Sequence, residues 1–311
     1  MKKGTAEKNR RGGTVFAAVR KFMLNDVSAW VLLLPAVLCL YFFVIRPQVT
    51  GIVWSFFNMT GYTVKDFVGF DNYVRIFKDP QFLQALKNTF KYVFWSIVLG
   101  YAFPIFTAVM MNEILHFRNT MRVFVYLPSA MPAVAVMMLW YLIYYPDTSG
   151  LLNIFLSKIG VPPQVWLQDQ KMTIFYIVLC MTWSGAGTTA IYYYSSLQEV
   201  SRELYEAAVM DGAGFLRRFS VVTLPHISGI ALLFFVRQIV GVFSVMEQPL
   251  QMTDGGPDGA STTLGLLAYK YGFVSVRPQL AMAIGAVMFV IMVAFTLFYF
   301  YLNKRVEESR G

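Results

Sequence analysis

The sequence predicts an all-α integral membrane protein with six transmembrane helices. Hydrophobic residues make up 57% of the chain and charged residues only 14%, whereas soluble proteins carry roughly 25% charged residues. Several charge-free stretches reach the length of about 17 to 25 residues that a membrane-spanning helix requires. Polar and apolar residues do not alternate along these stretches, as they would in the strands of a membrane barrel. A helical bundle is therefore the expected fold.

Gaps between charged residues mark the six expected helices. Five gaps contain no Asp, Glu, Lys or Arg, and they lie between Asp26 and Arg46, Lys91 and Glu113, Arg122 and Asp147, Lys171 and Glu199, and Arg277 and Lys304. A sixth segment, His226 to Pro249, is as apolar as the others except for Arg237 near its middle and Glu247 near its end. Prolines 104, 128, 132 and 249 are expected to kink or interrupt these helices.

The uncharged piece from Pro47 to Val64 has two interpretations. Its length would allow a further crossing of the membrane. It contains proline, glycine and asparagine residues, however, and these favour an external extension of the first helix. We therefore divide the chain into a basic tail (1–26), a first transmembrane helix with an external segment (27–84), a five-helix core (85–303) and a C-terminal tail (304–311).

Lysine and arginine predict the orientation, because cytoplasmic loops retain them. They cluster in the N-terminal tail at Lys2, Lys3, Lys8, Arg10, Arg11, Arg20 and Lys21. Six crossings then place both termini and the polar segment 199–225 in the cytoplasm, although the first external loop is also basic. We interpret the net charge of +9 as a signal of topology and lipid headgroups, since a nucleic-acid-binding protein would need a soluble basic face. The apolar segment after the tail lacks a cleavage pattern and is expected to act as a signal anchor.

Catalytic motifs are missing from the sequence. It contains no phosphate-binding loop, no zinc-protease motif and no nucleophile elbow, and its two histidines, His116 and His226, are expected near helix ends in interfacial structural roles. Cys39 and Cys180 lie in apolar spans, where they are expected to be small buried hydrophobes. We therefore expect no enzymatic activity, no metal and no cofactor in this chain.

The segment 199–225 is polar, whereas the rest of the chain is mostly apolar. A helical pattern runs through Ala208 and is interrupted at "DGAG", where Gly212 and Gly214 permit backbone conformations that end a helix. "FLRRFSVV" can form a second short helix, and Pro225 is tolerated in the first turn of the helix that follows. The pattern predicts a helix-turn-helix elbow that docks into a partner. An amphipathic loop on the lipid headgroups is the alternative.

The spacing within this elbow resembles a known signature. The pattern E-A-A, three residues, G, nine residues, an aliphatic residue, one residue and L-P is present as Glu206, Ala207, Ala208, Gly212, Val222, Leu224 and Pro225. It resembles the coupling loop of binding-protein-dependent ABC importer permeases, in which isoleucine is commoner at the position of Val222. "GFDNYVRIFKDPQFLQALKNT", "YLPSAMPAVAVMMLWYLIYYPDTSGLLN" and "TDGGPDGASTTL" are similar to segments of the carbohydrate branch, the maltose and multiple-sugar permease family.

The resemblance implies a type I ABC importer permease in a bacterial cytoplasmic membrane. Such a chain forms half of a pore for sugars or oligosaccharides, together with a related second permease. A homodimer is the alternative. Two separate ATP-binding cassette subunits would bind ATP and dock on the elbow, and an external solute-binding protein would deliver the solute. Glu206 is the candidate for a docking salt bridge, Ala207, Ala208 and Gly212 provide the close fit, and Asp211, Leu224 and Pro225 complete the coupling residues.

Two polar stretches are candidates for the substrate path, since polar groups within the membrane are costly unless they are used. "MTWSGAGTTAIYYYSS" and "VRQIVGVFSVMEQP" supply them. The resemblance places Trp183, Gly185, Thr188, Gln238, Gly241, Val242 and Val245 at solute-facing positions, and polarity adds Arg237 and Glu247. Helix packing is the alternative role for each of these residues.

Arg237 requires a partner or an aqueous cavity, because an arginine within the membrane costs a few kcal/mol. Glu247 is too far along the same helix to pair with it. Arg237 is expected either to form a structural ion pair with the second permease or to bind the carboxylate of an acidic sugar.

Two other classes of transporter remain as alternatives. Amino-acid or peptide ABC permeases share the elbow signature. An ion-coupled secondary transporter would require intramembrane acids, for which Glu247 alone is a candidate.

Overall fold

The structure is a computed structural model that describes residues 27–113 and 118–308. It divides into two compact units, which meet between Val53 and Trp54. His116 and the basic tail lie outside the described residues. The first unit is helical and comprises α2 (Val27–Leu40), a π-helical turn (Tyr41–Ile45) and α3 (Arg46–Trp54). Together they give an apolar helix of 25 residues from Trp30 to Trp54, which is long enough to span a membrane.

The second unit begins with a cap formed by a hairpin and a short helix. The strands β1 (Phe57–Thr60) and β2 (Thr63–Phe67) pair antiparallel around Gly61, whose φ of 58° suits a tight turn. The helix α4 (Asp71–Lys78) is fixed below this hairpin because the buried Asn72 donates to the carbonyls of Ser55 and Phe57, each at 2.9 Å. The segment predicted to extend the first helix is therefore helical to Trp54 and then turns into a hairpin.

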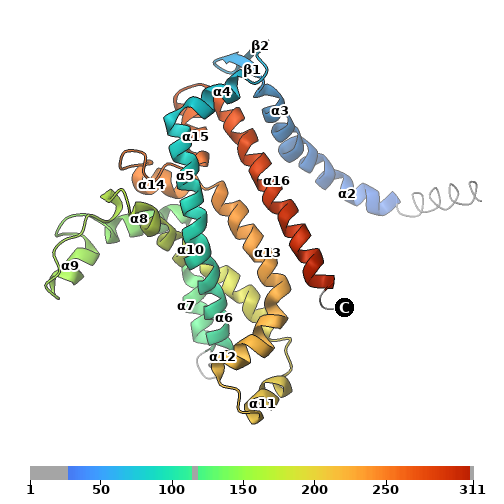
Figure 1. The fold of residues 1–311 in the computed structure, drawn as a ribbon, viewed down its shortest axis with the longest axis vertical. Coiled ribbons are helices and arrows are strands. Elements are labelled where there is room, and N and C mark those ends of the chain that lie inside the picture. The colour runs from blue at the N-terminus through green and yellow to red at the C-terminus, as the bar shows by residue number, and fades with distance from the viewer. Residues whose placement is uncertain (1–26, 114–117, 309–311) are drawn as a thin grey trace, which may run out of the picture. The chain divides into compact units, whose positions relative to one another are not determined.

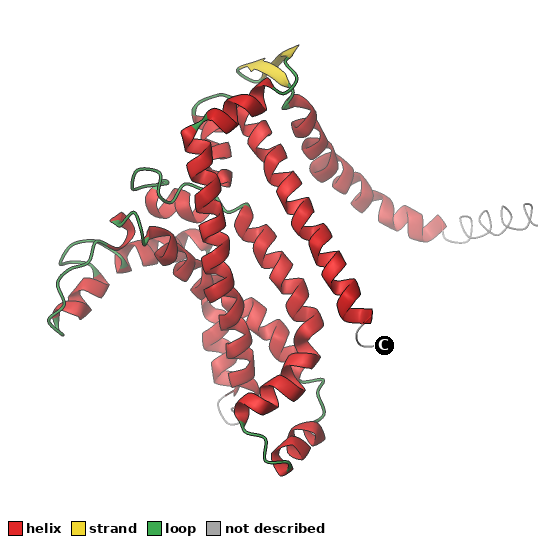
Figure 2. Cartoon of the chain, viewed as in Figure 1, coloured by secondary structure: helices red, strands yellow, loops and turns green. Residues whose placement is uncertain are grey.

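Four long helices form the body of the second unit (Figures 1 and 2). The first joins α5 (Pro80–Trp95), a π-helical turn (Ser96–Tyr101) and α6 (Ala102–Glu113), and the second is α10 (Thr173–Leu197). The third joins α12 (Phe215–Arg218), a π-helical turn (Phe219–Thr223) and α13 (Leu224–Phe243), and the fourth is α16 (Pro278–Glu308). In the cartoon of Figure 1, α13 runs between the α5–α6 helix and α16.

Prolines explain the π-helical turns. The turns that end at Ile45, Tyr101 and Thr223 each precede a proline by two or three residues, namely Pro47, Pro104 and Pro225. A proline lacks the backbone N–H and clashes with the carbonyl four residues earlier. A wider turn accommodates both defects, so these helices continue past the proline.

The third predicted span, Arg122 to Asp147, is not a continuous helix. It consists of α7 (Arg118–Ala130) and α8 (Ala133–Ile143), which meet at an angle of 96°. The break falls at Met131 and Pro132, because a residue before proline is driven out of the helical region. With the bent pair counted as one span, the described residues contain six candidate spans, as the sequence predicts.

The sixth segment also differs from its predicted limits. The helix starts at Phe215 instead of His226, and it ends at Phe243. After a short break, α14 (Glu247–Thr253) begins as a separate helix. Val245 and Glu247 therefore do not belong to the spanning helix, which corrects the expectation that they share a helix with Arg237.

The loop after α14 is tied to α5. This "GGP" loop leads to α15 (Leu264–Tyr269) and a π-helical turn (Lys270–Val274). Asn88 on α5 donates to the carbonyls of Gly259 at 2.8 Å and Thr262 at 3.1 Å, and Thr89 accepts from the backbone N–H of Leu264. Burial and a hydrogen bond to Asp79 raise the pKa of Tyr271 to about 12. These bonds hold the loop against the N-terminal half of α5.

A further segment without a spanning helix extends from α8. It contains α9 (Leu151–Ser157) and a 3-10 turn (Trp166–Gln168), and Figure 1 shows α9 at the far end of this segment. Asn153 organises it by donating to the carbonyls of Asp147 and Gln164, at 2.9 and 3.0 Å, while accepting from the indole of Trp166 at 2.9 Å.

The apolar core of the second unit has two parts. The larger part surrounds Phe82, Tyr92, Ile177, Phe243 and Ile284. The smaller part joins α6, α10 and α13 through Ala108, Met111, Tyr193, Leu197 and Ile227. The smaller core lies next to the segment 199–225, so the elbow is mounted on a packed base.

Candidate functional site

The predicted elbow consists of the short helix α11, which follows α10, and of α12, which is the first turn of the long helix that continues into α13. The helix α11 (Arg202–Met210) ends where Gly212 adopts a φ of 74°, and Ala213 N–H donates to the carbonyl of Ala208 at 2.9 Å. A bond of this kind with a glycine in the left-handed region is a standard helix C-cap. α12 then begins at Phe215 and runs without interruption into the membrane span.

The predicted coupling residues fall into two groups on the elbow. Glu206, Ala207, Asp211 and Gly212 are exposed on α11 and its C-terminus, and Ala208 is half-buried. Leu224 and Pro225 lie exposed at the start of α13. A hydrogen bond of 3.2 Å between Tyr205 and Thr223 connects the two arms.

The elbow exposes apolar side chains that a soluble loop would bury. Met210 is 87% exposed, Leu216 is 78% exposed, and Leu204, Val209 and Phe215 are exposed beside them. None of the residues of α11 is buried. An exposed apolar surface of this kind is typical of a protein-binding site.

Polar contacts fasten the elbow to α6 and α10. Arg218 forms an ion pair of 3.1 Å with Glu113, the last residue of α6. Next to it, the amide of Gln198 donates to Asn112 at 2.8 Å. The ring of His226 lies 3.1 Å from the carbonyl of Ser196, in agreement with its predicted structural role.

A hollow of about 300 Å³ lies behind these contacts, and both Glu206 and the pair of Arg218 with Glu113 line it. The pair is not predicted from the sequence, because the two residues are 105 positions apart. Their opposite charges at the ends of two helical segments were the available signal.

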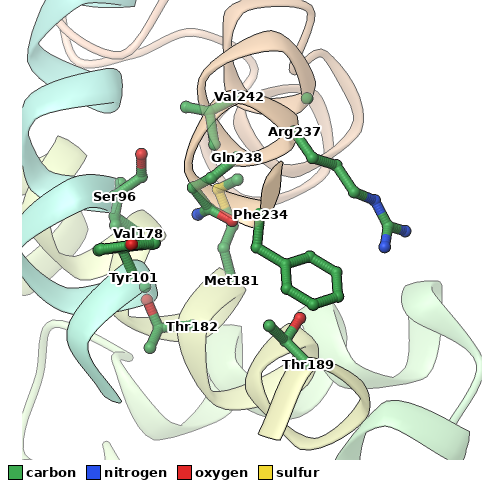
Figure 3. A pocket seen from close by; sticks show the side chains of 12 residues that line it. Ser96, Tyr101, Val178, Met181, Thr182, Thr189, Phe234, Arg237, Gln238 and Val242 are labelled. Atoms are coloured by element: carbon green, nitrogen blue, oxygen red, sulfur yellow. The ribbon is translucent and has the colours of Figure 1, made fainter. Parts of the chain in front are cut away.

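A second hollow lies within the bundle (Figure 3). It has a volume of about 250 Å³ and is enclosed by the π-helical turn between α5 and α6, by α10 and by α13. Its lining includes Ser96, Gly100, Tyr101, Met181, Thr182, Thr189, Phe234, Arg237, Gln238, Gly241 and Val242. Four of the predicted path residues on α13 are therefore brought together here, namely Arg237, Gln238, Gly241 and Val242.

This pocket lies at mid-depth. The turn Ser96–Tyr101 is central in the 34-residue helix from Pro80 to Glu113, and Thr182 and Thr189 lie in the middle third of the 25-residue α10. Because a helix rises about 1.5 Å per residue, both positions are more than about 10 Å from either helix end. Polar groups at this depth lie within the hydrocarbon layer of a membrane.

The back of the pocket is formed by a close contact at Gly100. A Cβ atom at that position would lie 2.8 Å from the Gln238 amide nitrogen and 3.3 Å from the Thr182 hydroxyl. The glycine therefore allows the amide to lie directly on the backbone of the π-helical turn. Neither Gly100 nor Thr182 was predicted from the sequence, because a glycine in an apolar span does not show which side chain covers it.

Arg237 lies at the open side of the pocket and is exposed. Figure 3 shows its side chain extending past Phe234, and its guanidinium carbon is 5.8 Å from the centre of that ring. Along α13, the residues Gly229, Leu233, Arg237 and Gly241 recur every fourth position and are all exposed. They form one face, onto which the pocket opens.

Three predicted path residues on α10 do not line the pocket. Gly185 and Thr188 are exposed, and Trp183 contacts Trp140 with ring centres 5.8 Å apart. Trp183 and Thr188 are five residues apart and so about 140° apart around the helix. Trp183 and Thr188 therefore lie on different faces of α10. Their role in a solute path stays a prediction, as do those of Val245 and Glu247.

The chain is similar to transport proteins throughout. The family model described as "Binding-protein-dependent transport system inner membrane component" matches residues 100–308. The chain is 32% identical over 290 residues to a probable ABC transporter permease protein, YurN of Bacillus subtilis, with 92% of this chain and 99% of the relative covered. It is 30% identical to the trehalose/maltose transport system permease protein MalF of Thermococcus litoralis, with 88% and 93% covered.

A solved structure shares the fold. A chain of a bacterial alginate ABC transporter, solved in complex with a periplasmic protein that holds an alginate pentasaccharide, superposes with a TM-score of 0.80. The two chains are 25% identical, and the match covers 92% of this chain and 97% of the other.

Proposed function

Because the chain belongs to the family of inner membrane components of binding-protein-dependent transport systems, we propose that it is the permease subunit of an ATP-driven importer of sugars or oligosaccharides. In this proposal the chain forms half of a translocation pore with a second, related permease. Two ATP-binding cassette subunits dock on the elbow, and an external binding protein delivers the solute. Both termini face the cytoplasm.

The observation that carries the proposal is the exposed elbow mounted on two spanning helices. α11 has no buried residue in this chain, and several of its apolar side chains are exposed. The left-handed cap at Gly212 nevertheless gives the helix a defined C-terminus. An isolated helix of nine residues is unstable in water, so a docking partner is expected to cover it. The ATPase subunits are the partner that the family supplies.

The exposed face of α13 supports the half-pore. It carries Arg237 and two glycines, and lipid would not solvate the guanidinium group. A second permease placed opposite this face would close a path lined by both chains. ATP hydrolysis would then move the elbows, and the two bundles would rock around the path as rigid bodies.

Sugars are the solute class that the relatives favour. The Thermococcus relative is a trehalose/maltose permease, and the solved transporter imports an acidic polysaccharide, alginate. The pocket offers an amide and hydroxyl groups beside Tyr101 and Phe234. Hydroxyl groups and aromatic faces are the groups that protein sites use to orient polar ligands.

The test is uptake by the whole complex with Glu206→Arg. The chain, its copurifying permease and the ATPase subunits are reconstituted in liposomes with binding protein outside and ATP inside, and uptake of labelled maltose, trehalose and a set of oligosaccharides is measured. We expect ATP-dependent uptake by the wild type. Glu206→Arg should abolish it and release the ATPase subunits, since a charge reversal at a docking pair costs several kcal/mol.

Glu199→Arg is the matched control, because Glu199 is also exposed but precedes α11. It should retain uptake. Full activity of Glu206→Arg would exclude the docking role of that residue, and uptake driven by an ion gradient without ATP would exclude the importer.

A further inference from the structure

The described spanning helices offer Arg237 no acidic partner at its own level. They carry carboxylates only near one end, at Glu113, Glu307 and Glu308. Arg237 lies at the level of the pocket, in the middle of the bundle, and its guanidinium group contacts the ring of Phe234. Within the described residues, these helices therefore leave the counter-charge of Arg237 to be supplied by another group.

The surroundings of Arg237 favour a ligand over a buried structural pair. A Cβ atom added at Gly241, one turn along the same exposed face, would meet nothing within 4 Å. Phe234 holds one face of the guanidinium group, so its N–H edges stay free for a planar acceptor. Arg237 thus lies at the rim of a hollow with room beside it.

The rest of the lining is neutral. Gln238, Thr182 and Ser96 provide an amide and hydroxyl groups, and the pocket contains no second cation. A guanidinium group and a carboxylate match in charge and in their paired hydrogen-bonding geometry. A phosphate dianion would keep one charge unbalanced against a single arginine. The amide and hydroxyl groups suit the hydroxyls of a sugar.

We infer that the solute carried along this path is a sugar bearing a carboxylate, and that Arg237 binds the carboxylate while Gln238 and Thr182 face the neutral part. This inference rests on the proposed function and narrows its substrate class to uronic-acid-containing sugars. It assigns Arg237 as the specificity-determining residue of this chain.

The experiment compares matched charged and neutral sugars in the reconstituted complex. The probes are labelled trigalacturonate, the same trisaccharide with its carboxyl groups reduced to alcohols, maltose, and glucose 1-phosphate as a phosphate probe. The same binding protein delivers a given sugar to the wild type and to the variant. The ratio of the variant's uptake rate to that of the wild type for this sugar therefore isolates the contribution of the permease. The variants are Arg237→Gln and Arg237→Lys. The control is Arg75→Gln, which removes only an exposed external ion pair with Asp71.

We expect the wild type to take up trigalacturonate, and Arg237→Gln to lower that rate about tenfold or more, because a hydrogen-bonded charge pair is lost. Uptake of any neutral sugar should change little, and Arg237→Lys should retain part of the acidic-sugar uptake. Arg75→Gln should behave like the wild type.

Three results would overturn the inference while the proposed function stands. The first is that the wild type takes up neutral sugars or glucose 1-phosphate with ATP but does not take up trigalacturonate. The second is that Arg237→Gln lowers the uptake of all sugars equally. The third is that the companion permease no longer copurifies with the Arg237→Gln variant. The last result would show that Arg237 pairs with an acid of the other permease. No ATP-dependent uptake of any sugar by the wild type would overturn the proposed function, and the inference with it.

Discussion

The elbow and the intramembrane pocket are built in opposite ways. The elbow is a continuous segment, and its shape depends on local features such as the glycine cap at Gly212. The pocket is assembled from three separate helices that meet at Gly100, Thr182 and Gln238. A local site can be recognised from one stretch of sequence, whereas an assembled site depends on how helices pack. The two regions should therefore respond differently to small changes.

The largest effect is expected at Gly187, where α7 crosses α10. A Cβ atom there would lie 2.1 Å from the carbonyl oxygen of Val125, and Ser129 donates to the carbonyl of Ser184 at 2.6 Å in the same contact. Gly187→Ala should separate the two helices and destabilise the protein by about 3 kcal/mol. Thermal unfolding of the detergent-purified protein measures this loss.

Gly185→Ala is the control for Gly187→Ala, because a Cβ atom at Gly185 would meet nothing within 4 Å. Its midpoint of unfolding should stay close to that of the wild type. Equal midpoints for the two variants would contradict the close contact between α7 and α10.

An intermediate effect is expected at Gly212 in the elbow. Its φ of 74° is unfavourable for a residue with a side chain, although no atom blocks the space. Gly212→Ala should destabilise the local conformation of the elbow by about 1 kcal/mol. It should lower the amount of ATPase that copurifies, while the unfolding midpoint of the helix bundle stays unchanged. Gly214→Ala, at a φ of −67°, should have no such effect. A fall in bundle stability with Gly212→Ala would show that the elbow is not an independent local structure.

The smallest effect on stability is expected at the pair of Arg218 with Glu113. Their side chains are 22% and 32% exposed, so the pair should contribute no more than about 1 kcal/mol to folding. Arg218→Gln should still bind the ATPase subunits but transport less solute per ATP, because the elbow is less firmly attached to α6. Uptake and phosphate release measured together give this ratio.

Arg217→Gln, at the exposed neighbouring arginine, should keep the ratio of the wild type. Exchange of the two charges, Glu113→Arg with Arg218→Glu, should restore it. An unchanged ratio in Arg218→Gln would mean that the pair does not hold the elbow during transport.

The sequence predicted the elements better than their contacts. Apolar length identified the spans, and the E-A-A spacing with Gly212 identified the elbow, because both signals are local. The interruption at Pro132 was predicted and is confirmed, but its angle of 96° was not predicted, since a proline can either kink a helix or end it. On α13, polarity selected Arg237 and the family resemblance selected Gln238, and both line the pocket. On α10 the resemblance selected Trp183 and Thr188, which do not line it, whereas Thr182 and Thr189 do. The rotation of a helix about its own axis determines which of these neighbouring side chains faces the pocket, and the sequence pattern does not predict that rotation.

The uninterrupted helix from Phe215 to Phe243 has a mechanical consequence. It begins in the elbow and continues through its π-helical turn to the pocket, so it can act as a lever. Arg237 is 22 residues beyond Phe215, which is about 33 Å at 1.5 Å per residue. If the helix pivots near one end, a tilt of about 5° displaces the other end by about 3 Å, roughly the length of one hydrogen bond. A small stroke at the elbow is thus enough to make or break a hydrogen bond at the level of Arg237, with no change in secondary structure between the two places.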